Sequence, residues 1–349
     1  MGYLVRTPDV AEARDAMLSI WAANLSVRGA PEARLRWFYS DGPHGPGWAF
    51  LLHTGDAREA PVGVAGLGIR RLWLGDRPLH AGLFADLAIE RAHRSGLPAL
   101  ALVRAVWRHV ADQLDLGYGF PNHKAVAIYR RAGYHQLGEM QRYVRVLRSG
   151  PYVARHVRDP DLAGAVAAVA DLAITAFDRA RARLVRGFEL TWIYAFDPRF
   201  DGLWEEGRHL APIACERTEA LLTWRFLRQP GHRYRIATLL DRRTRRLRAY
   251  AVVRIDTPVP ELSDLYGAGL RELDALLRLL LPALPALGHD SITFRFLGTP
   301  ALPALLARHG FRRRPERRMV ALAIGDRLAG EPAVADPASW YLTDLDEDS

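Results

Sequence analysis

The segment from Leu79 to Tyr134 constrains the fold most, because it reads as a strand, a short basic loop and a helix in direct succession. Apolar residues alternate or run together from Leu83 to Ile89, as in a largely buried strand. A turn with Arg91 and Arg94 follows, and apolar residues then recur at helical spacing from Leu100 to Val110. Backbone N–H groups at such a helix start bind anions, and arginines on the rim suit a pyrophosphate. The segment therefore predicts a phosphate site between a strand and a helix.

A second pattern follows in the same segment. Asn122 is placed to cap a short helix that carries Tyr129 near its last turn, and Gly133 ends that helix before Tyr134. The segment resembles the GNAT superfamily of acyl-CoA N-acyltransferases. In that family a strand ends at an Arg-rich pyrophosphate loop, and an Asn, six residues, Tyr pattern with a Gly-aromatic pair follows.

The resemblance implies an acetyl-CoA or other acyl-CoA co-substrate. The family loop reads Arg or Gln, two residues, Gly, one residue, Gly or Ala, and here Arg94, Leu97 and Ala99 take those places. Leucine thus replaces the first glycine, and Pro98 has no N–H to offer a phosphate. The cofactor-binding residues that the resemblance implies are Ile89, Arg91, Arg94, Ser95, Gly96, Leu97, Ala99, Asn122 and Tyr129.

Three residues are candidates for acid and base chemistry. The resemblance makes Tyr129 the general acid that protonates the departing CoA thiolate, whereas a packing role between helix and sheet is the alternative. Asp86 and Glu90 are candidates for the base that takes a proton from an ammonium acceptor. An unpaired carboxylate in an apolar strand costs free energy, so we expect Asp86 either to be paired with a hydrogen-bond donor or to have a functional role.

Bulk properties narrow the class of protein. A chain of 349 residues suits two domains, and it contains no run of 18 apolar residues, so we expect no membrane span. Cys215 is the only cysteine and the histidines lack metal-ligand spacing, which predicts a cytoplasmic protein without a metal. The net charge of +9 comes almost wholly from arginine, with Lys124 as the only lysine, so we read it as composition bias and do not expect nucleic acid as a partner.

The second part of the chain echoes the first. Asp86 and Asp264 lie 178 residues apart and Tyr134 and Phe311 lie 177 apart, within similar surroundings. Two echoes at one offset indicate an internal duplication. At that offset Thr299 takes the place of Asn122 and Leu306 takes that of Tyr129, and the basic loop is missing. A leucine cannot donate a proton, so the second copy resembles a degenerate GNAT domain.

These patterns predict an α+β fold made of two tandem GNAT-like domains, each a mixed, mostly antiparallel sheet flanked by helices. The domains expected are 1–148 (acyl-CoA binding), 149–187 (a linker with a long helix that packs between the halves), 188–326 (the degenerate copy) and 327–349 (an acidic, mobile tail).

The leading functional hypothesis is an N-acyltransferase that moves an acetyl group from acetyl-CoA directly to an amine of a small molecule, an amino sugar or a peptide. One alternative is a non-catalytic CoA-sensing or scaffold protein, suggested by Leu97 and by the degenerate second copy. Another is a Fem-like transferase that uses aminoacyl-tRNA. A homodimer is compatible with each of these hypotheses, and the sequence does not name the acceptor.

Overall fold

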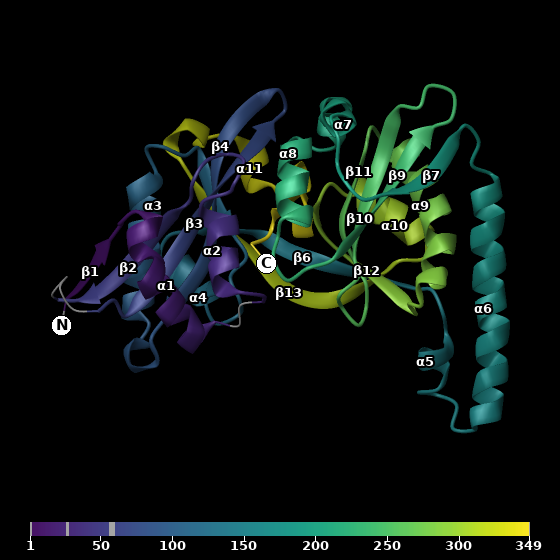
Figure 1. Ribbon diagram of the computed structural model, residues 1–349, viewed down its shortest axis with the longest axis horizontal. Coiled ribbons are helices and arrows are strands. Elements are labelled where there is room, and N and C mark those ends of the chain that lie inside the picture. The colour runs from purple at the N-terminus through teal and green to yellow at the C-terminus, as the bar shows by residue number, and fades with distance from the viewer. Residues whose placement is uncertain (1, 26–27, 56–59, 349) are drawn as a thin grey trace.

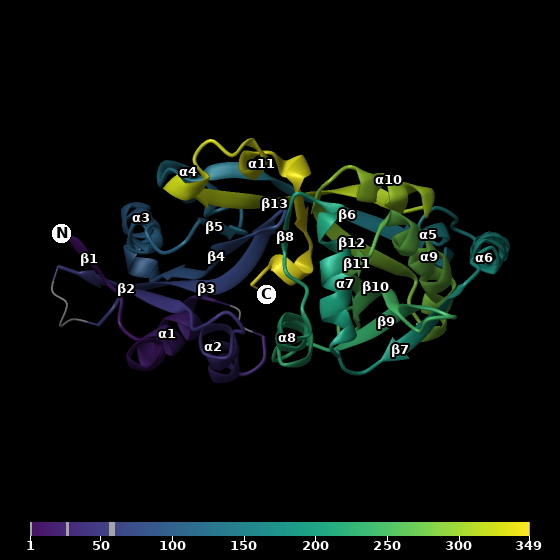
Figure 2. The ribbon, with the colours of Figure 1, turned by 90° about the horizontal axis from the view of Figure 1, so that it is seen from above.

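The computed structural model describes residues 2–25, 28–55 and 60–348, and its backbone is one long mixed sheet with helices on both faces (Figures 1 and 2). The order of twelve strands is β1-β2-β3-β4-β5-β13-β6-β12-β11-β10-β9-β7, and β8 and β14 pair beside this path. The sheet therefore runs without a break through both parts of the chain.

The first half contains the strands β1 (Tyr3–Arg6), β2 (Trp48–Thr54), β3 (Gly63–Leu74), β4 (Arg77–Ile89), β5 (Leu116–Gly119) and β6 (His135–Val146). Its helices are α1 (Val10–Asn24), α2 (Pro31–Tyr39), α3 (Leu97–Val110) and α4 (Val126–Arg131). The second half contains β7 (Phe188–Ile193), β9 (Tyr234–Asp241), β10 (Leu247–Arg254), β11 (Glu261–Gly267), β12 (Ser291–Gly298) and β13 (Arg312–Ile324). Its helices are α7 (Arg199–Gly207), α8 (Glu219–Leu222), α9 (Leu270–Leu280) and α10 (Ala301–Arg308).

The two halves repeat the same succession of strands and helices. In each half one neighbouring pair is parallel, β4 with β5 and β11 with β12, while the other neighbours on the main path are antiparallel. The loop between β11 and α9 is only Ala268 and Gly269, so the second half lacks the basic loop of the first. The predicted fold class, α+β with mostly antiparallel sheets, is confirmed.

The last strand of each half is exchanged with the other half. β6 pairs with β12, with Arg145 opposite Ile292, and β13 pairs with β5, with Ala321 opposite Gly119. The two exchanged strands also pair with each other. The predicted ranges 1–148 and 188–326 therefore follow the repeat along the chain, but the two halves share one sheet. Hydrophobic periodicity identifies a strand and does not identify its partner.

Helices on opposite faces of the first half bury apolar stripes. α3 packs Leu102, Val103 and Val106 into a cluster with strands β2 to β4, and Pro98 fits its first turn because φ is already suited there. α1 buries Met17 and Trp21 in the cluster that continues into the second half. Figure 2 shows α3 and α1 on the two sides of the sheet.

Helix α6 (Pro160–Arg183) does not pack between the halves, and this expectation is wrong. The helix stands at the outer end of the second half, beside the short α5 (Gly150–Val153), as Figures 1 and 2 show. Its alanine-rich sequence is typical of a helix that packs against another part of the protein, but composition does not indicate which part that is.

The C-terminal tail is not mobile in the structure, which corrects the expectation for 327–349. Its described part forms α11 (Pro332–Ala335) and β14 (Trp340–Leu342), and β14 pairs with β12 and with β8 (Ile213–Cys215). Trp340 is fully buried, and its indole N–H donates to the carbonyl of Val334 at 3.1 Å. The acidic composition predicted a solvated tail. In the structure, however, its carboxylates pair with arginines from the rest of the chain, some of them buried.

Trp340→Ala tests how strongly the docked tail stabilises the fold. Removing a fully buried indole leaves a cavity, so we expect the free energy of unfolding to fall by about 3–5 kcal/mol in denaturant titration. The matched control is Tyr194→Ala, because Tyr194 is 94% exposed and its loss is expected to change stability by less than about 0.5 kcal/mol. Equal effects for the two variants would contradict a docked tail.

Candidate functional site

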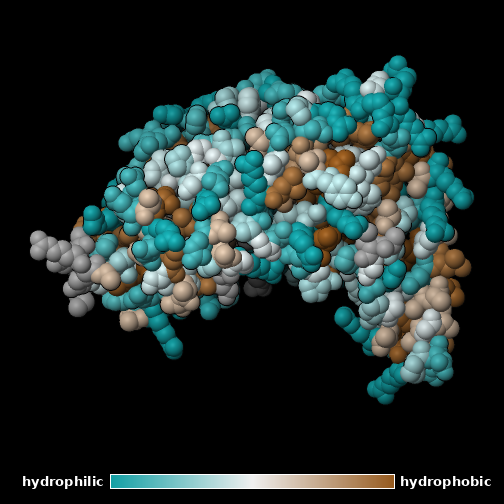
Figure 3. Space-filling model, in the orientation of Figure 1, coloured by the Kyte–Doolittle hydropathy of each residue, from teal (hydrophilic) through white to brown (hydrophobic). Residues whose placement is uncertain are grey.

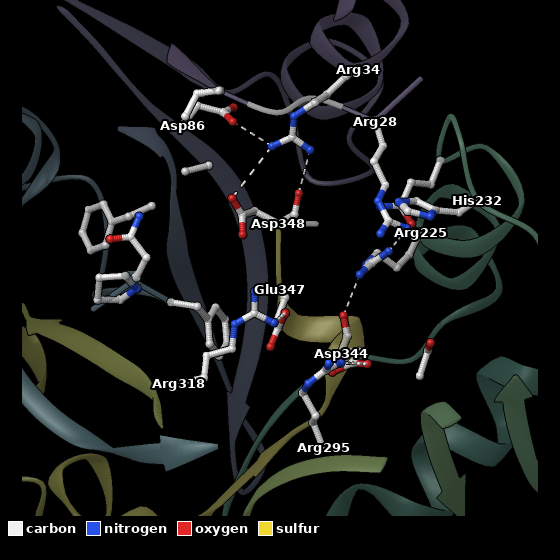
Figure 4. A pocket seen from close by; sticks show the side chains of 18 of the residues that line it. Arg28, Arg34, Asp86, Arg225, His232, Arg295, Arg318, Asp344, Glu347 and Asp348 are labelled. Atoms are coloured by element: carbon white, nitrogen blue, oxygen red, sulfur yellow. Dashed lines mark hydrogen bonds and ion pairs between the residues drawn. The ribbon is translucent and has the colours of Figure 1, made fainter. Parts of the chain in front are cut away.

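A cavity of about 500 Å³ opens where the two halves and the tail meet, and Figure 4 shows the side chains around it. The first half contributes the end of β4 and the segment that leads into α4. The second half and the tail contribute most of the charged side chains. Its polar and charged lining includes Arg34, Asp86, Asn122, Tyr129, Arg295, Arg318, Asp344, Glu347 and Asp348.

The cavity reaches the point where β4 and β5 separate. Their parallel pairing ends at Phe84 and Gly119, and β4 continues to Ile89 without β5 beside it. The separation coincides with a bulge opposite β3, where Asp86 has a positive φ of 54°. Backbone groups at the end of β4 thus border the cavity rather than a paired β5.

Asp86 is held by two donors. Arg34 on α2 donates to Oδ1 at 2.8 Å, and the Tyr39 hydroxyl donates to Oδ2 at 2.7 Å. Gly66 leaves room for the Tyr39 side chain, because a Cβ at position 66 would lie 1.7 Å from the Tyr39 hydroxyl oxygen. Asp86 therefore has the partner that its position in the strand demands.

The second half repeats this arrangement at Asp264. Arg217 approaches Asp264 at 3.2 Å, and the hydroxyls of Tyr250 and Thr343 donate to it at 2.5 and 2.8 Å. Because the same kind of pairing recurs in the half where Leu306 takes the place of Tyr129, a structural role for Asp86 gains support over a role as base.

Tyr129 lines the cavity and is 7% exposed. Its ring packs 6.2 Å from that of Phe84 and 5.1 Å from that of Tyr134, and no described residue hydrogen-bonds its hydroxyl. Burial raises the pKa of Tyr129 above its ordinary value, and the charge of Asp348 raises it further. The phenol is therefore protonated at neutral pH, and Tyr129 borders the cavity.

Asn122 caps the turn that leads into α4. Its Oδ1 accepts from the backbone N–H groups of Lys124 and Ala125 at 3.0 and 3.1 Å, as an N-cap does. The side chain also borders the cavity, so both roles considered for it remain compatible with its position.

The predicted phosphate loop lies beyond the cavity at the start of α3. Arg94 folds back, and its guanidinium donates to the carbonyl of Ile89 at 2.9 Å and to Asn24 at 2.6 Å. Gly96 takes a φ of 89° before the helix, and Leu97 is 70% exposed. Since Pro98 carries no N–H, the first turn offers the N–H groups of Leu97 and Ala99 to an anion.

The remaining predicted residues separate into two groups. Arg91 and Ser95 are exposed on the same loop, and Ile89 is buried at the end of β4. Glu90 is exposed and does not border the cavity. The structure therefore does not bring Glu90 together with Tyr129.

Sequence reasoning missed the carboxylates of the tail. Asp344, Glu347 and Asp348 border the cavity, and their partners include Arg295, Arg318 and Arg34 respectively. Figure 4 shows Asp348 between Arg34 and the cavity. The signal was present as an apolar triplet, Trp340 to Leu342, directly before the acids, which is the pattern of a docked strand.

Burial shifts the ionisation of these acids. It raises the pKa of Asp344 to about 6 although Arg295 opposes the shift, and it raises that of Glu347 to about 8 although Arg318 opposes it. The pKa of Asp348 is also raised, by burial first. The cavity thus holds carboxyl groups that can exchange protons near neutral pH.

The corresponding gap in the second half is closed by the tail. The parallel pairing of β11 with β12 ends at Leu262 and Phe294, and β14 then pairs with β12, with Tyr341 opposite Gly298. The Tyr341 hydroxyl donates to the carbonyl of Leu265 on β11. The two gaps are related by the repeat, and in the second half the tail strand β14 occupies the gap.

Among the described residues, no group of three or more His, Cys, Asp and Glu side chains is arranged to hold a metal ion. A metal-free site stays a prediction.

No protein-family model and no curated protein sequence matches the chain. Solved structures do match its fold. A probable N-acyltransferase of unknown function from Enterococcus faecalis superposes with a TM-score of 0.67 at 12% identity, over 92% of this chain and 72% of that one. A GCN5-related N-acetyltransferase from Anabaena variabilis gives 0.61 at 14% identity, over 93% and 73%. Another from Kribbella flavida gives 0.58 at 14% identity, over 94% and 72%. The chain therefore has the fold of GCN5-related N-acetyltransferases.

Glu347→Gln tests the buried acid of the cavity through the pH dependence of stability. A carboxyl whose pKa is raised in the folded state stabilises the fold while it is protonated, and this contribution is lost as the pH rises towards 8. Gln stays neutral, so the variant should gain stability over the wild type between pH 5 and pH 9 by a few kcal/mol in denaturant titration. Glu331→Gln, at an exposed position, is the control. A pH-independent difference would show that Glu347 ionises as it does in water.

Proposed function

We propose that the protein transfers an acyl group from acetyl-CoA, or another acyl-CoA, directly to an amine. The observation that carries this proposal is the open gap between β4 and β5, which borders one cavity together with the Tyr129 hydroxyl and the tail carboxylates. The fold shared with N-acetyltransferases supports it.

The residues around the gap suit the steps of such a transfer. The open edge of β4, near Asp86 and Leu87, offers backbone groups to an extended pantetheine arm and to the carbonyl oxygen on which negative charge develops. The start of α3 lies further out and would meet the pyrophosphate with the N–H groups of Leu97 and Ala99. Tyr129, kept protonated by burial, then gives its proton to the thiolate as the amine takes the acyl group.

The amine must lose a proton before or during its attack. Asp86 is engaged by Arg34 and Tyr39, and Glu90 lies outside the cavity. Glu347 and Asp348 also border the cavity, where Arg318 and Arg34 pair with them. Their raised pKa values make their ionised forms stronger bases than an ordinary carboxylate, so they are further candidates to receive that proton. The acceptor can be a small amine, an amino sugar or a peptide, since the cavity is wide and lined by both signs of charge.

Calorimetric titration with acetyl-CoA and with free CoA tests cofactor binding. We expect one site per chain with a micromolar dissociation constant, because the tail fills the second gap. Two sites would contradict the closed second gap. No binding at millimolar ligand would mean that Leu97 and Pro98 close the phosphate site.

Tyr129→Phe tests the general acid. We expect kcat for acyl transfer to fall roughly 100-fold or more, with the affinity for acetyl-CoA changed by less than a factor of about 3. Tyr134→Phe is the matched control, because that hydroxyl donates to the carbonyl of Val103 at 3.1 Å and does not border the cavity. Transfer that survives Tyr129→Phe undiminished would refute the assignment.

The non-catalytic CoA-sensing or scaffold hypothesis is favoured by the exposed Leu97 and by Arg94, which binds its own loop. This hypothesis would gain support if CoA binds and no amine is acylated. The aminoacyl-tRNA hypothesis predicts salt-sensitive binding of tRNA, and its absence would remove that hypothesis.

A further inference from the structure

The side of helix α6 that faces the rest of the chain carries charged side chains beside small alanines, and its buried residues are Ala163, Ala167 and Asp178. The Asp171 carboxylate accepts from the backbone N–H of Ser149 at 2.5 Å. Asp178 accepts two hydrogen bonds from Arg145, both at 3.0 Å. Arg181 donates to the carbonyl of Arg308 at 2.7 Å. Polar contacts thus fix the helix to the second half.

The opposite side of α6 is apolar and faces solvent. At 100° per residue the exposed apolar residues fall on one continuous stripe about 140° wide. Its large members are Leu162 (56% exposed), Val166 (43%), Val169 (71%), Leu172 (71%), Phe177 (54%) and, just past the helix end, Leu184 (69%). Exposed alanines at 165, 173, 176 and 180 complete it. Figure 3 shows hydrophobic atoms at the outer edge, where Figure 1 places α6.

An apolar stripe that runs the length of a 24-residue helix marks an interaction surface. We propose that this stripe is a dimer interface, where α6 packs antiparallel against α6 of a second copy of the chain around a two-fold axis near Leu172. Such an isologous contact closes on itself and hides both stripes.

The charges on α6 favour this partner and this direction. Asp161 is exposed in the first turn, eleven residues before Leu172, and Arg183 is exposed in the last turn, eleven residues after it. An antiparallel pair centred on Leu172 therefore sets Asp161 beside Arg183 of the second copy at each end. A parallel pair would set like charges together.

A lipid bilayer is the competing occupant. Among the described residues, α6 is the helix long and apolar enough to cross a membrane by length and composition. Insertion would pull Asp171 and Asp178 away from their donors in the body, which is costly in hydrocarbon. The dimer needs no such change.

Cysteine cross-linking of the full chain tests the arrangement against a clean background, since the one native cysteine, Cys215, is buried. Under mild oxidation Leu172→Cys should form a disulfide-linked dimer, because the two copies meet at the axis. Leu162→Cys should not, because the two Leu162 positions would lie about 30 Å apart at 1.5 Å per residue. Cross-linking of both variants would indicate a parallel pair and overturn the proposal.

Sedimentation equilibrium tests the stripe itself. The wild type should be dimeric, and Val169→Asp should weaken dimerisation roughly 100-fold or more, because two carboxylates would be buried in each interface. Tyr194→Asp, at a 94% exposed position on another element, should leave the dimer intact. Unchanged circular dichroism and thermal unfolding of Val169→Asp would show that the variant folds. A monomeric wild type, or wild-type protein that floats with phosphatidylcholine vesicles, would overturn the proposal.

Discussion

The reciprocal exchange of β6 and β13 is the constraint on which the rest of the structure depends. Each half alone would end in a parallel pair with an open edge, at β5 or at β12, and the strand that covers this edge comes from the other half. Because β6 and β13 also pair with each other, both halves are fixed at one distance and angle. The charged cavity between them therefore exists only in the joined molecule.

The docked C-terminal tail lies where the two halves meet. Its carboxylates enter a region crowded with arginines, where Arg217 and Arg225 are almost fully buried. A buried guanidinium is tolerated when it is well paired, and Arg217 meets both Asp264 and Asp346 of the tail. Asp346 pairs with the buried Arg217, and its neighbours Asp344, Glu347 and Asp348 border the cavity, so the stability of the fold and the candidate site depend on one short segment.

The helices and strands of the first half were largely predictable from the sequence. The signals that indicate them are the hydrophobic periodicity, Pro98 and the Asn122 cap, and each depends only on residues close by in the chain. The duplication was also predictable, since Asp86 and Asp264 both lie at or next to a register shift, on β4 and on β11 respectively. The strand exchange, the outer position of α6 and the docking of the tail were not. Each of these depends on which distant surface is complementary, and periodicity carries no such information.

The difference between the two gaps explains how one duplicated fold can keep a single site. A gap between parallel strands leaves backbone N–H and C=O groups that need partners. In the second half β14 supplies them as protein backbone, and Leu306 stands where Tyr129 would be. In the first half no described segment enters the gap, so those groups stay available to an extended ligand arm. The open first gap and the occupied second gap thus meet the same requirement for backbone hydrogen bonds in two different ways.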